Sequence, residues 1–321
     1  MKPEEAIDVS KCAYSAYGYT YPNPDIYYPE KVRDYNNTGK MISIVAVENS
    51  QNEIIGHTAL KPILTDNIAE VGVSFIKPKF RGCGCFNKLE KARIDEAGQR
   101  NIKCLFSSAV TTHPFSQKAA HKYGFKDSAL MVSCIPSLEF KKISGDKRER
   151  ESLMISFLHL SEPENKTVFL AEKHKTIIRK IFANLGIEPE YRNLKNRYSL
   201  KKIQSEIETV TDPFGGASIK INKFGADIFD KIAGLKKGLC LDKFIYITLY
   251  LDLSEPLNAF YCEKFEEMEF FFCGIFPGIN KQHQLVLQFL NNQKVNYDII
   301  KTDSEFGAEL LAYIKSADPN C

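Results

Sequence analysis

AEVGVSFIKPKFRGCGCFNKLEKARIDEAGQR, residues 69–100, is the stretch of sequence that decides the fold. It predicts a β-strand, a turn with two glycines, and a helix that begins at about Cys85. In the strand, Val71, Val73 and Phe75 alternate with polar or small residues, so one face of the strand is apolar. The glycines let the backbone of the turn approach a ligand closely. Because free N–H groups and the positive end of a helix favour an anion, we expect a phosphate to bind there.

Within this stretch, VSFIKPKFRGCG (residues 73–84) resembles the acyl-CoA-binding motif of the GNAT superfamily of N-acetyltransferases. Arg81 and Gly84 match that motif directly. A Walker-type Gly-Lys-Ser/Thr and a spaced G-x-G-x-x-G are both absent from the sequence, which argues against the nucleotide-binding folds. In the GNAT family the turn amides hold the coenzyme pyrophosphate, and the preceding strand holds the pantetheine arm. The resemblance therefore implies acetyl-CoA as co-substrate.

Carried over by position, the resemblance places the pantetheine contacts at Val73 and Phe75. A backbone N–H near one of these two residues is expected to bind the thioester carbonyl oxygen. Phe86 stands where the family commonly has Gly or Ala, which predicts a turn of slightly different shape. The expected pyrophosphate contacts are Arg81, Gly82, Cys83, Gly84, Cys85 and Phe86.

Glu70 is the candidate for the catalytic base. It alternates with the apolar strand residues and is expected to share the other face of the strand with Gly72 and Ser74. A carboxylate at this place can accept the proton of an attacking amine, directly or through water. The alternative is a solvated charge near the end of a strand.

The general acid is less clear from the sequence. The phrase SQKAAHKYGF, residues 116–125, resembles the family's helix beside the thioester, but Ala120 stands where many members have a tyrosine that protonates the thiolate. We expect His113 to take this role, because it follows a predicted strand at its carboxyl end. The alternatives are Ser116, His121 and Tyr123.

Seven of the fifteen tyrosines fall within the first 35 residues. Tyrosine combines apolar area with a polar tip, which suits the half-buried wall of a ligand site. In GNAT enzymes the segment between the first two helices commonly forms the acceptor wall, and here we expect substrate contacts from it. The alternative is a loop that packs only on its own domain. The expected contacts are Tyr19, Tyr21, Tyr27 and Tyr28.

Composition limits the class of protein. The chain is 44% hydrophobic and 26% charged, as in soluble globular proteins. Its net charge of +3 is too balanced to imply a nucleic-acid partner. No apolar run approaches the length of a membrane span, and the start has no signal-peptide core, so we expect a cytoplasmic protein with no membrane partner.

The nine cysteines are scattered, without a C-x-x-C pair, and most lie in apolar segments as small hydrophobic residues. Cys83 and Cys85 are possible exceptions, because a helix N-terminus lowers the pKa of a thiol. The six histidines show no metal-ligand spacing, so we predict no metal site.

The length of 321 residues suits two domains, and we place the boundary in the polar segment before residue 163. After residue 163 we predict a strand-helix-strand-helix-strand-strand order, which repeats that of the second half of the first domain. The fold class is therefore α/β (α+β), with two GNAT-like domains, 1–162 and 163–321, each a twisted mixed sheet flanked by helices. The turn at 221–225 lacks the paired glycines and the arginine, so it should not bind a pyrophosphate. An unrelated α/β domain is the alternative for the second half.

The charged stretch 138–152 is interpreted as a solvated hairpin excursion, with an interdomain linker as the alternative. For the whole chain, the sequence favours an N-acetyltransferase that acts by direct attack in a ternary complex. The acceptor would be a small-molecule or peptide amine, and the oligomeric state is open. The alternative is a non-catalytic acyl-CoA-binding or protein-interaction module.

Overall fold

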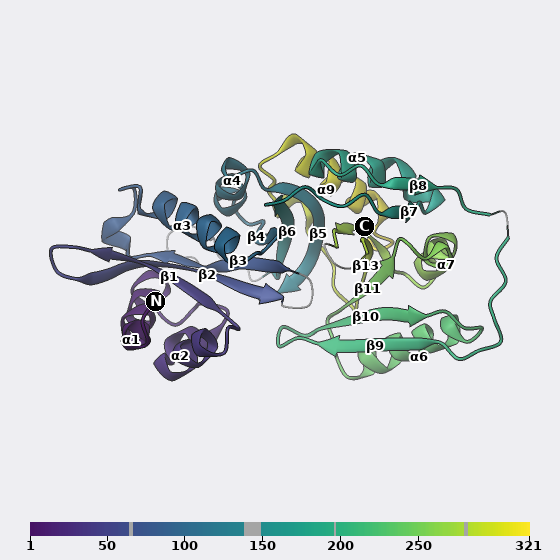
Figure 1. The fold of residues 1–321 in the computed structure, drawn as a ribbon. Coiled ribbons are helices and arrows are strands. Elements are labelled where there is room, and N and C mark those ends of the chain that lie inside the picture. Colours follow the sequence, from purple (N-terminus) through teal and green to yellow (C-terminus); the bar gives the residue numbers. More distant parts are fainter. Residues whose placement is uncertain (64–66, 138–148, 196, 279–281) are drawn as a thin grey trace. The chain divides into compact units, whose positions relative to one another are not determined.

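The computed structural model describes residues 1–63, 67–137, 149–195, 197–278 and 282–321 (Figure 1). Contacts between residues divide the chain into two compact units, each with a mixed β-sheet and helices packed on it, so the expected α/β class is confirmed. The predicted boundary before residue 163 stays a prediction, and the charged residues 138–148 lie outside the described part. Unit 1 contains Met1–Ser108 and Leu158–Glu162, and unit 2 contains Ala109–Ser137, Glu149–Phe157 and Pro163–Cys321.

In unit 1 the strands of residues 42–48 and 53–63 form a hairpin, and the strand after them continues the antiparallel meander. The crossover helix then leads to a strand that is parallel to β3, as expected for a strand-helix-strand unit. The elements are α1 (Ala6–Tyr17), α2 (Pro29–Asn37), β1 (Ile42–Glu48), β2 (Glu53–Ile63), β3 (Ile68–Ile76), α3 (Cys85–Gln99) and β4 (Cys104–Val110), with short 3-10 turns at Pro3–Glu5, Pro24–Tyr27 and Pro78–Phe80.

Helices cover both faces of this meander. Helices α1 and α2 lie on one face of β1–β3, and α3 lies on the other (Figure 1). The apolar side of α1 carries Val9 and Ala13, which are fully buried with Ala59 of β2 and Phe75 of β3. Gly18 ends α1 with a φ of 64°, a conformation that glycine adopts without steric penalty.

A β-bulge interrupts β3 opposite Thr58. Two residues of β3, Val73 and Ser74, oppose this single residue of β2. Val73 has a φ of 51°, which is rare for a β-branched side chain and strained. Bulges and strained backbones occur often at functional sites, so this position is a candidate for function.

The bulge changes which side chains share a face of β3. The predicted alternation is wrong beyond Gly72, because one extra residue moves every later side chain to the other face. Glu70 and Gly72 therefore lie on the α1 side together with Val73 and Phe75. Ser74 instead turns toward α3. The carboxylate of Glu70 thus shares a face with Val73 and Phe75, the two predicted pantetheine contacts. The sequence alternation had placed Glu70 on the opposite face from these two residues.

Arg93 of α3 lies beneath the bulge. Although it carries a charge, its side chain is buried. Its Nη1 donates hydrogen bonds to Thr58 Oγ1 at 2.8 Å and to Ser74 Oγ at 3.2 Å. Its Nη2 donates to the buried carboxylate of Glu90. Burial raises the pKa of Glu90, although the guanidinium opposes this shift.

Replacing Arg93 should destabilise the protein, because the change leaves Glu90 buried without its cation. We expect Arg93→Met to lose about 3 kcal/mol of unfolding free energy, the usual effect of breaking a buried ion pair. Urea denaturation measures this loss. Lys91→Met, at an exposed position of the same helix, should change stability by less than about 0.5 kcal/mol. Equal losses for the two variants would contradict a buried ion pair.

Unit 2 contains a sheet with the strand order β6-β5-β12-β13-β11-β10-β9. Helices α5 and α9 pack on β5 and β12. Helix α9 is absent from the sequence-based prediction. The elements are α4 (Phe115–Lys122), β5 (Lys126–Ile135), β6 (Glu151–His159), β7 (Thr167–Phe169), α5 (Lys175–Leu185), β8 (Glu190–Arg192), β9 (Glu206–Thr211), β10 (Gly216–Lys223), α6 (Ile228–Leu241), β11 (Tyr246–Asp252), α7 (Pro256–Phe260), α8 (Cys262–Glu266), β12 (Phe271–Phe276), β13 (Gln284–Leu290) and α9 (Glu305–Ala317).

The strand pairings of unit 2 resemble those of unit 1. Strand β10 is antiparallel to β9 and, after the crossover helix α6, parallel to β11. Strand β3 has the same relation to β2 and, after α3, to β4. The antiparallel pair β12 and β13 then follows β11, as the pair β5 and β6 follows β4.

Candidate functional site

The turn between β3 and α3 is open to solvent. Gly82 and Gly84 both have a φ of 81°, and no atom lies within 4 Å of the place where a Cβ would stand on either residue. The backbone N–H groups of residues 82–85 donate no hydrogen bond to any part of the chain that the structure describes. Helix α3 begins directly after the turn, at Cys85. The predicted anion-binding geometry is therefore present, with room for a ligand.

The cations near the turn are of two kinds. Lys77 and Lys79 both form ion pairs with Glu53 of β2, at 2.7 and 3.2 Å. Arg81 and Lys88 take part in no ion pair among the described residues. These two side chains, together with the turn amides, are thus the groups that remain for an anion.

One edge of β3 is unpaired beside the bulge. The parallel pairing with β4 begins at Ile68 and Cys104 and stops at Val71 and Ser107, although β3 continues to Ile76. In the described chain no strand pairs with residues 72–76 on this side. An extended ligand can therefore form hydrogen bonds with this part of the strand, as a further strand would.

The tyrosine-rich segment lies partly against β3. The ring of Tyr21 packs on Phe75 with centroids 6.3 Å apart, and the hydroxyl of Tyr27 accepts a hydrogen bond from the Tyr21 N–H at 3.0 Å. Tyr19 and Tyr28 are 78% and 50% exposed. The structure thus brings two of the four predicted wall residues to the strand and leaves the other two at the surface.

Glu70 lies next to this aromatic group. Burial raises the pKa of the Tyr21 phenol, with smaller contributions from the Tyr17 phenol and from the Glu70 carboxylate, while the backbone amide of Val73 lowers it. The Lys61 ammonium donates to Glu70 Oε2 at 3.2 Å. The other carboxylate oxygen has no hydrogen bond with a described residue. It is thus available to a water molecule or an amine.

His57 was not predicted as a site residue, yet it holds the bulge. Its Nδ1 lies 2.7 Å from the Val73 carbonyl, its Nε2 lies 2.9 Å from Ser43 Oγ, and its ring stacks on Phe75. Because a carbonyl can only accept, Nδ1 carries the proton and Nε2 accepts from the serine hydroxyl. Burial lowers the pKa of His57 to about 4, so this ring is neutral near pH 7. The sequence signal that could have indicated His57 is a single histidine within the otherwise apolar run IIGHTAL, residues 54–60.

The pKa of His57 predicts an acid-sensitive fold. The unfolded chain binds a proton below its ordinary pKa of 6.5, whereas the folded chain does so only below about 4. Stability is therefore complete above pH 6.5 and falls as the pH decreases toward 4, by roughly 3 kcal/mol from this group. His57→Asn has no titrating group at this position, so its stability should not include this contribution. Urea denaturation between these pH values should show a steeper decline for the wild type, and parallel curves would refute the assignment.

His113, the expected general acid, lies in unit 2, whereas Glu70 lies in unit 1. The imidazole is buried beside the ring of Phe115, and burial lowers its pKa. The role of His113 with Glu70 stays a prediction. Ala120, at the family's tyrosine position, is buried in α4.

His121, one of the alternatives, is held between Asp127 and Asp303 at 2.8 and 3.0 Å. These carboxylates raise its pKa. Of the two cysteines in the turn, Cys85 is buried and burial raises the pKa of its thiol, which disfavours reactivity there. Cys83 is exposed, and its Sγ donates to the Phe80 carbonyl at 2.9 Å.

One group of potential metal ligands is found among the described residues of unit 2. His174, Cys262 and Glu266 place their ligand atoms within 4.8 Å of one another. Hydrogen bonds already use two of them, because His174 bonds Tyr313 and Glu266, and Glu266 also accepts from Lys173. The absence of a metal site stays a prediction.

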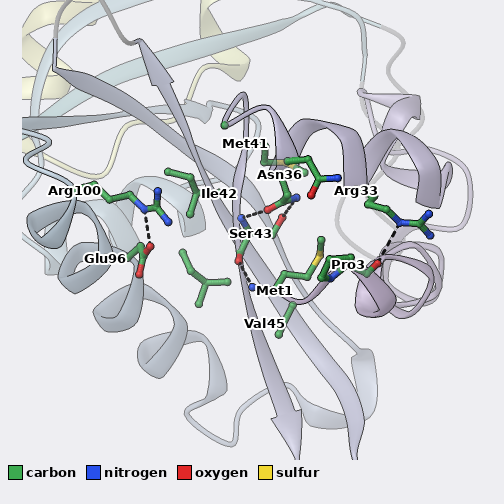
Figure 2. A pocket seen from close by; sticks show the side chains of 13 residues that line it. Met1, Pro3, Arg33, Asn36, Met41, Ile42, Ser43, Val45, Glu96 and Arg100 are labelled. Carbon is green, nitrogen blue, oxygen red and sulfur yellow. Dashed lines mark hydrogen bonds and ion pairs between the residues drawn. The ribbon is translucent and has the colours of Figure 1, made fainter.

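A pocket of about 510 Å³ lies along the edge strand β1 in unit 1 (Figure 2). Its walls come from the N-terminal residues, α2, β1 and the end of α3, and they include none of the predicted site residues. Asn36 forms two hydrogen bonds with Ser43 here, through its amide nitrogen to Oγ and through its oxygen from the backbone N–H. Because Ser43 also bonds His57, this wall is connected to the bulge.

A comparison with protein families finds a match for the N-terminal part of the chain. Residues 8–125 match the family described as Acetyltransferase (GNAT) family. The match covers less than half of the chain and contains every predicted site residue. The GNAT family uses acetyl-CoA. In the described residues no helix is both long and apolar enough to cross a membrane.

Comparison with curated proteins gives no match. Solved structures do match, although their TM-scores are too low to carry an argument about substrate. One is the ribosomal-protein-S5-alanine acetyltransferase of Vibrio fischeri, with 13% identity, 50% of this chain and 91% of that chain covered, and a TM-score of 0.40. A second is YncA of Salmonella typhimurium, solved with its cofactor acetyl-CoA. It has 16% identity, 51% of this chain and 93% of that chain are covered, and the TM-score is 0.40. A third is the spermidine/spermine N-acetyltransferase SpeG of Vibrio cholerae. It has 14% identity, 50% of this chain and 91% of that chain are covered, and the TM-score is 0.39.

Proposed function

We propose that the chain is an N-acetyltransferase that transfers the acetyl group of acetyl-CoA directly to a primary amine in a ternary complex. One observation carries the proposal: an open turn with unpaired N–H groups, Gly82–Cys85, follows a bulged strand with an unpaired edge. The first feature suits a pyrophosphate, and the second suits an extended amide-containing arm and a polarised carbonyl.

The residues present fit the coenzyme. The N–H groups of residues 82–86 and the guanidinium of Arg81 would hold the pyrophosphate, and the space above both glycines leaves room for it. The backbone at Val73 and Phe75 would hold the pantetheine arm along the unpaired edge. Bound there, the coenzyme supplies an activated acetyl thioester beside Glu70 on the α1 side of the strand.

A charge in the turn tests this placement. Gly84→Glu should weaken the binding of acetyl-CoA at least about a hundredfold, because like charges in contact cost several kcal/mol. Calorimetric titration measures the affinity, and thermal unfolding verifies that the variant folds. Gly98→Glu, at an exposed position near the other end of α3, is the matched control and should bind as the wild type does. Gly84→Ala separates backbone strain from charge. Similar affinities for both glutamate variants would place the coenzyme elsewhere.

The proposed reaction needs a neutral amine, a polarised carbonyl and a proton for the thiolate. The amine nitrogen forms a bond with the acetyl carbon while the amide N–H near Val73 stabilises the negative charge on oxygen. Glu70 takes the proton that the amine loses, directly or through water. The carbon–sulfur bond then breaks, and the thiolate receives a proton from a general acid, for which His113 is the candidate.

Removing the proposed base should affect turnover more than coenzyme binding. Glu70→Gln is expected to lower kcat by about a hundredfold or more, the usual contribution of a general base. Detection of free thiol with a panel of amines measures kcat, and calorimetry measures the affinity for acetyl-CoA. Glu48→Gln, on the edge strand β1, should leave both unchanged. Full turnover by Glu70→Gln would reduce this carboxylate to a solvated strand charge.

The acceptor is proposed to be a small molecule or a peptide with a primary amine. The half-buried pair Tyr21 and Tyr27 would form its wall, with Tyr19 and Tyr28 at the outer rim. A non-catalytic acyl-CoA-binding module is the second candidate, favoured by Ala120 at the position of the family's tyrosine. Binding of acetyl-CoA without turnover of any amine would support that candidate.

We also propose that residues 163–321 form a second, GNAT-like domain after a first domain of residues 1–162. The repeated pairing of β9, β10 and β11 supports this division. In the corresponding turn, a Cβ on Gly225 would stand 2.1 Å from the Ile203 carbonyl oxygen, so neighbouring backbone fills the space that a pyrophosphate would need. A cytoplasmic location and the absence of nucleic-acid and membrane partners stay predictions.

A further inference from the structure

We propose that His57 and Arg93 are positioning residues for acetyl transfer, because they hold the Val73 bulge from opposite faces of the sheet so that its amide meets the acetyl carbonyl. This inference rests on the proposed function. Neither side chain is expected to touch the acetyl group. Each acts through the strand backbone.

On the α1 side, a chain of hydrogen bonds ends at the bulge. The amide of Asn36 in α2 donates to Ser43 Oγ, the serine hydroxyl donates to His57 Nε2, and His57 Nδ1 donates to the Val73 carbonyl. The direction of all three bonds is fixed, because the amide nitrogen of Asn36 can only donate and the Val73 carbonyl can only accept. The peptide between Val73 and Ser74 cannot rotate without breaking the last bond.

On the α3 side, two hydroxyl groups and one guanidinium group meet beneath the peptide between Val73 and Ser74. Arg93 Nη1 donates to both Thr58 Oγ1 and Ser74 Oγ, and these two oxygens lie 2.7 Å apart. Ser74 is the bulge residue that faces α3, and Thr58 is the single residue opposite the bulge. Glu90 holds the guanidinium in place by an ion pair. The side chain of Ser74 is therefore fixed while His57 fixes the carbonyl before it.

The strain at Val73 explains why two contacts are needed. A left-handed φ at a β-branched residue costs about 1–2 kcal/mol, so the strand would relax toward extended geometry without them. Relaxation would turn the amide of Val73 away from its present direction, in which it lies close to the Tyr21 hydroxyl. The glycine turn is a separate segment, with its own backbone geometry. Loss of His57 should thus affect recognition of the acetyl group and spare recognition of the pyrophosphate.

Binding of CoA and of acetyl-CoA separates these two effects, since the ligands differ only in the acetyl group. We expect the wild type to bind acetyl-CoA more tightly than CoA. His57→Phe keeps a ring to stack on Phe75 but removes the hydrogen bond to Val73, and should reduce this preference by about tenfold, the effect of one hydrogen bond. Its affinity for CoA should stay within about twofold of the wild type. His57→Asn, whose amide can replace Nδ1 as donor, should restore the preference.

Ser74→Ala tests the α3 side without leaving Glu90 unpaired, and should also reduce the preference for acetyl-CoA. Equal weakening of both ligands in His57→Phe would show a merely structural role and overturn the inference. An unchanged preference in His57→Phe and Ser74→Ala, or equal binding of both ligands by the wild type, would do the same. A wild type that binds neither ligand would instead overturn the proposed function. Thermal unfolding of each variant verifies that the compared proteins are folded.

Discussion

A β-branched residue with a positive φ is strained, and at the Val73 bulge hydrogen bonds reach β3 from both faces, to the Val73 carbonyl on one and to the Ser74 hydroxyl on the other. The arrangement of unit 1 around it follows from this constraint. The imidazole must be neutral and buried, which requires the aromatic ring of Phe75 above it and the serine hydroxyl beyond it. The guanidinium must also be buried, which requires Glu90 beside it. Two costly polar burials are thus stabilised at a single point of the sheet.

The bulge and the glycine turn divide the proposed work along one strand. The turn offers unpaired N–H groups and space, so it suits a ligand part that is anionic and common to every acyl-CoA. The bulge offers one oriented amide on the face that also carries Glu70, so it suits the reacting carbonyl. Because of the extra residue, Val73 lies on the same face as Glu70. The proposed carbonyl site is therefore next to the proposed base only as long as the bulge is present.

Much of unit 1 could be predicted from the sequence, because strand alternation and paired glycines are local signals. The open turn, the start of α3 at Cys85 and the parallel strand after it are confirmed. The face of Glu70 was wrong, since a bulge adds one residue without any change in composition. The burial of Arg93 was not predicted, because it depends on partners on another element. His57 was missed for the same reason, since only tertiary contacts give a buried histidine its role.

Glu53 has a consequence for the electrostatics of the proposed site. By pairing with both Lys77 and Lys79 it offsets one of the two positive charges that these lysines place beside the turn. Recognition of an anion then falls to the N–H groups of the turn, which carry no net charge, together with Arg81 and Lys88. Dissolved salt screens exposed charges much more strongly than groups that a bound ligand covers. The affinity of this turn for its anion should consequently depend less strongly on ionic strength than that of a site built from a cluster of unpaired lysines.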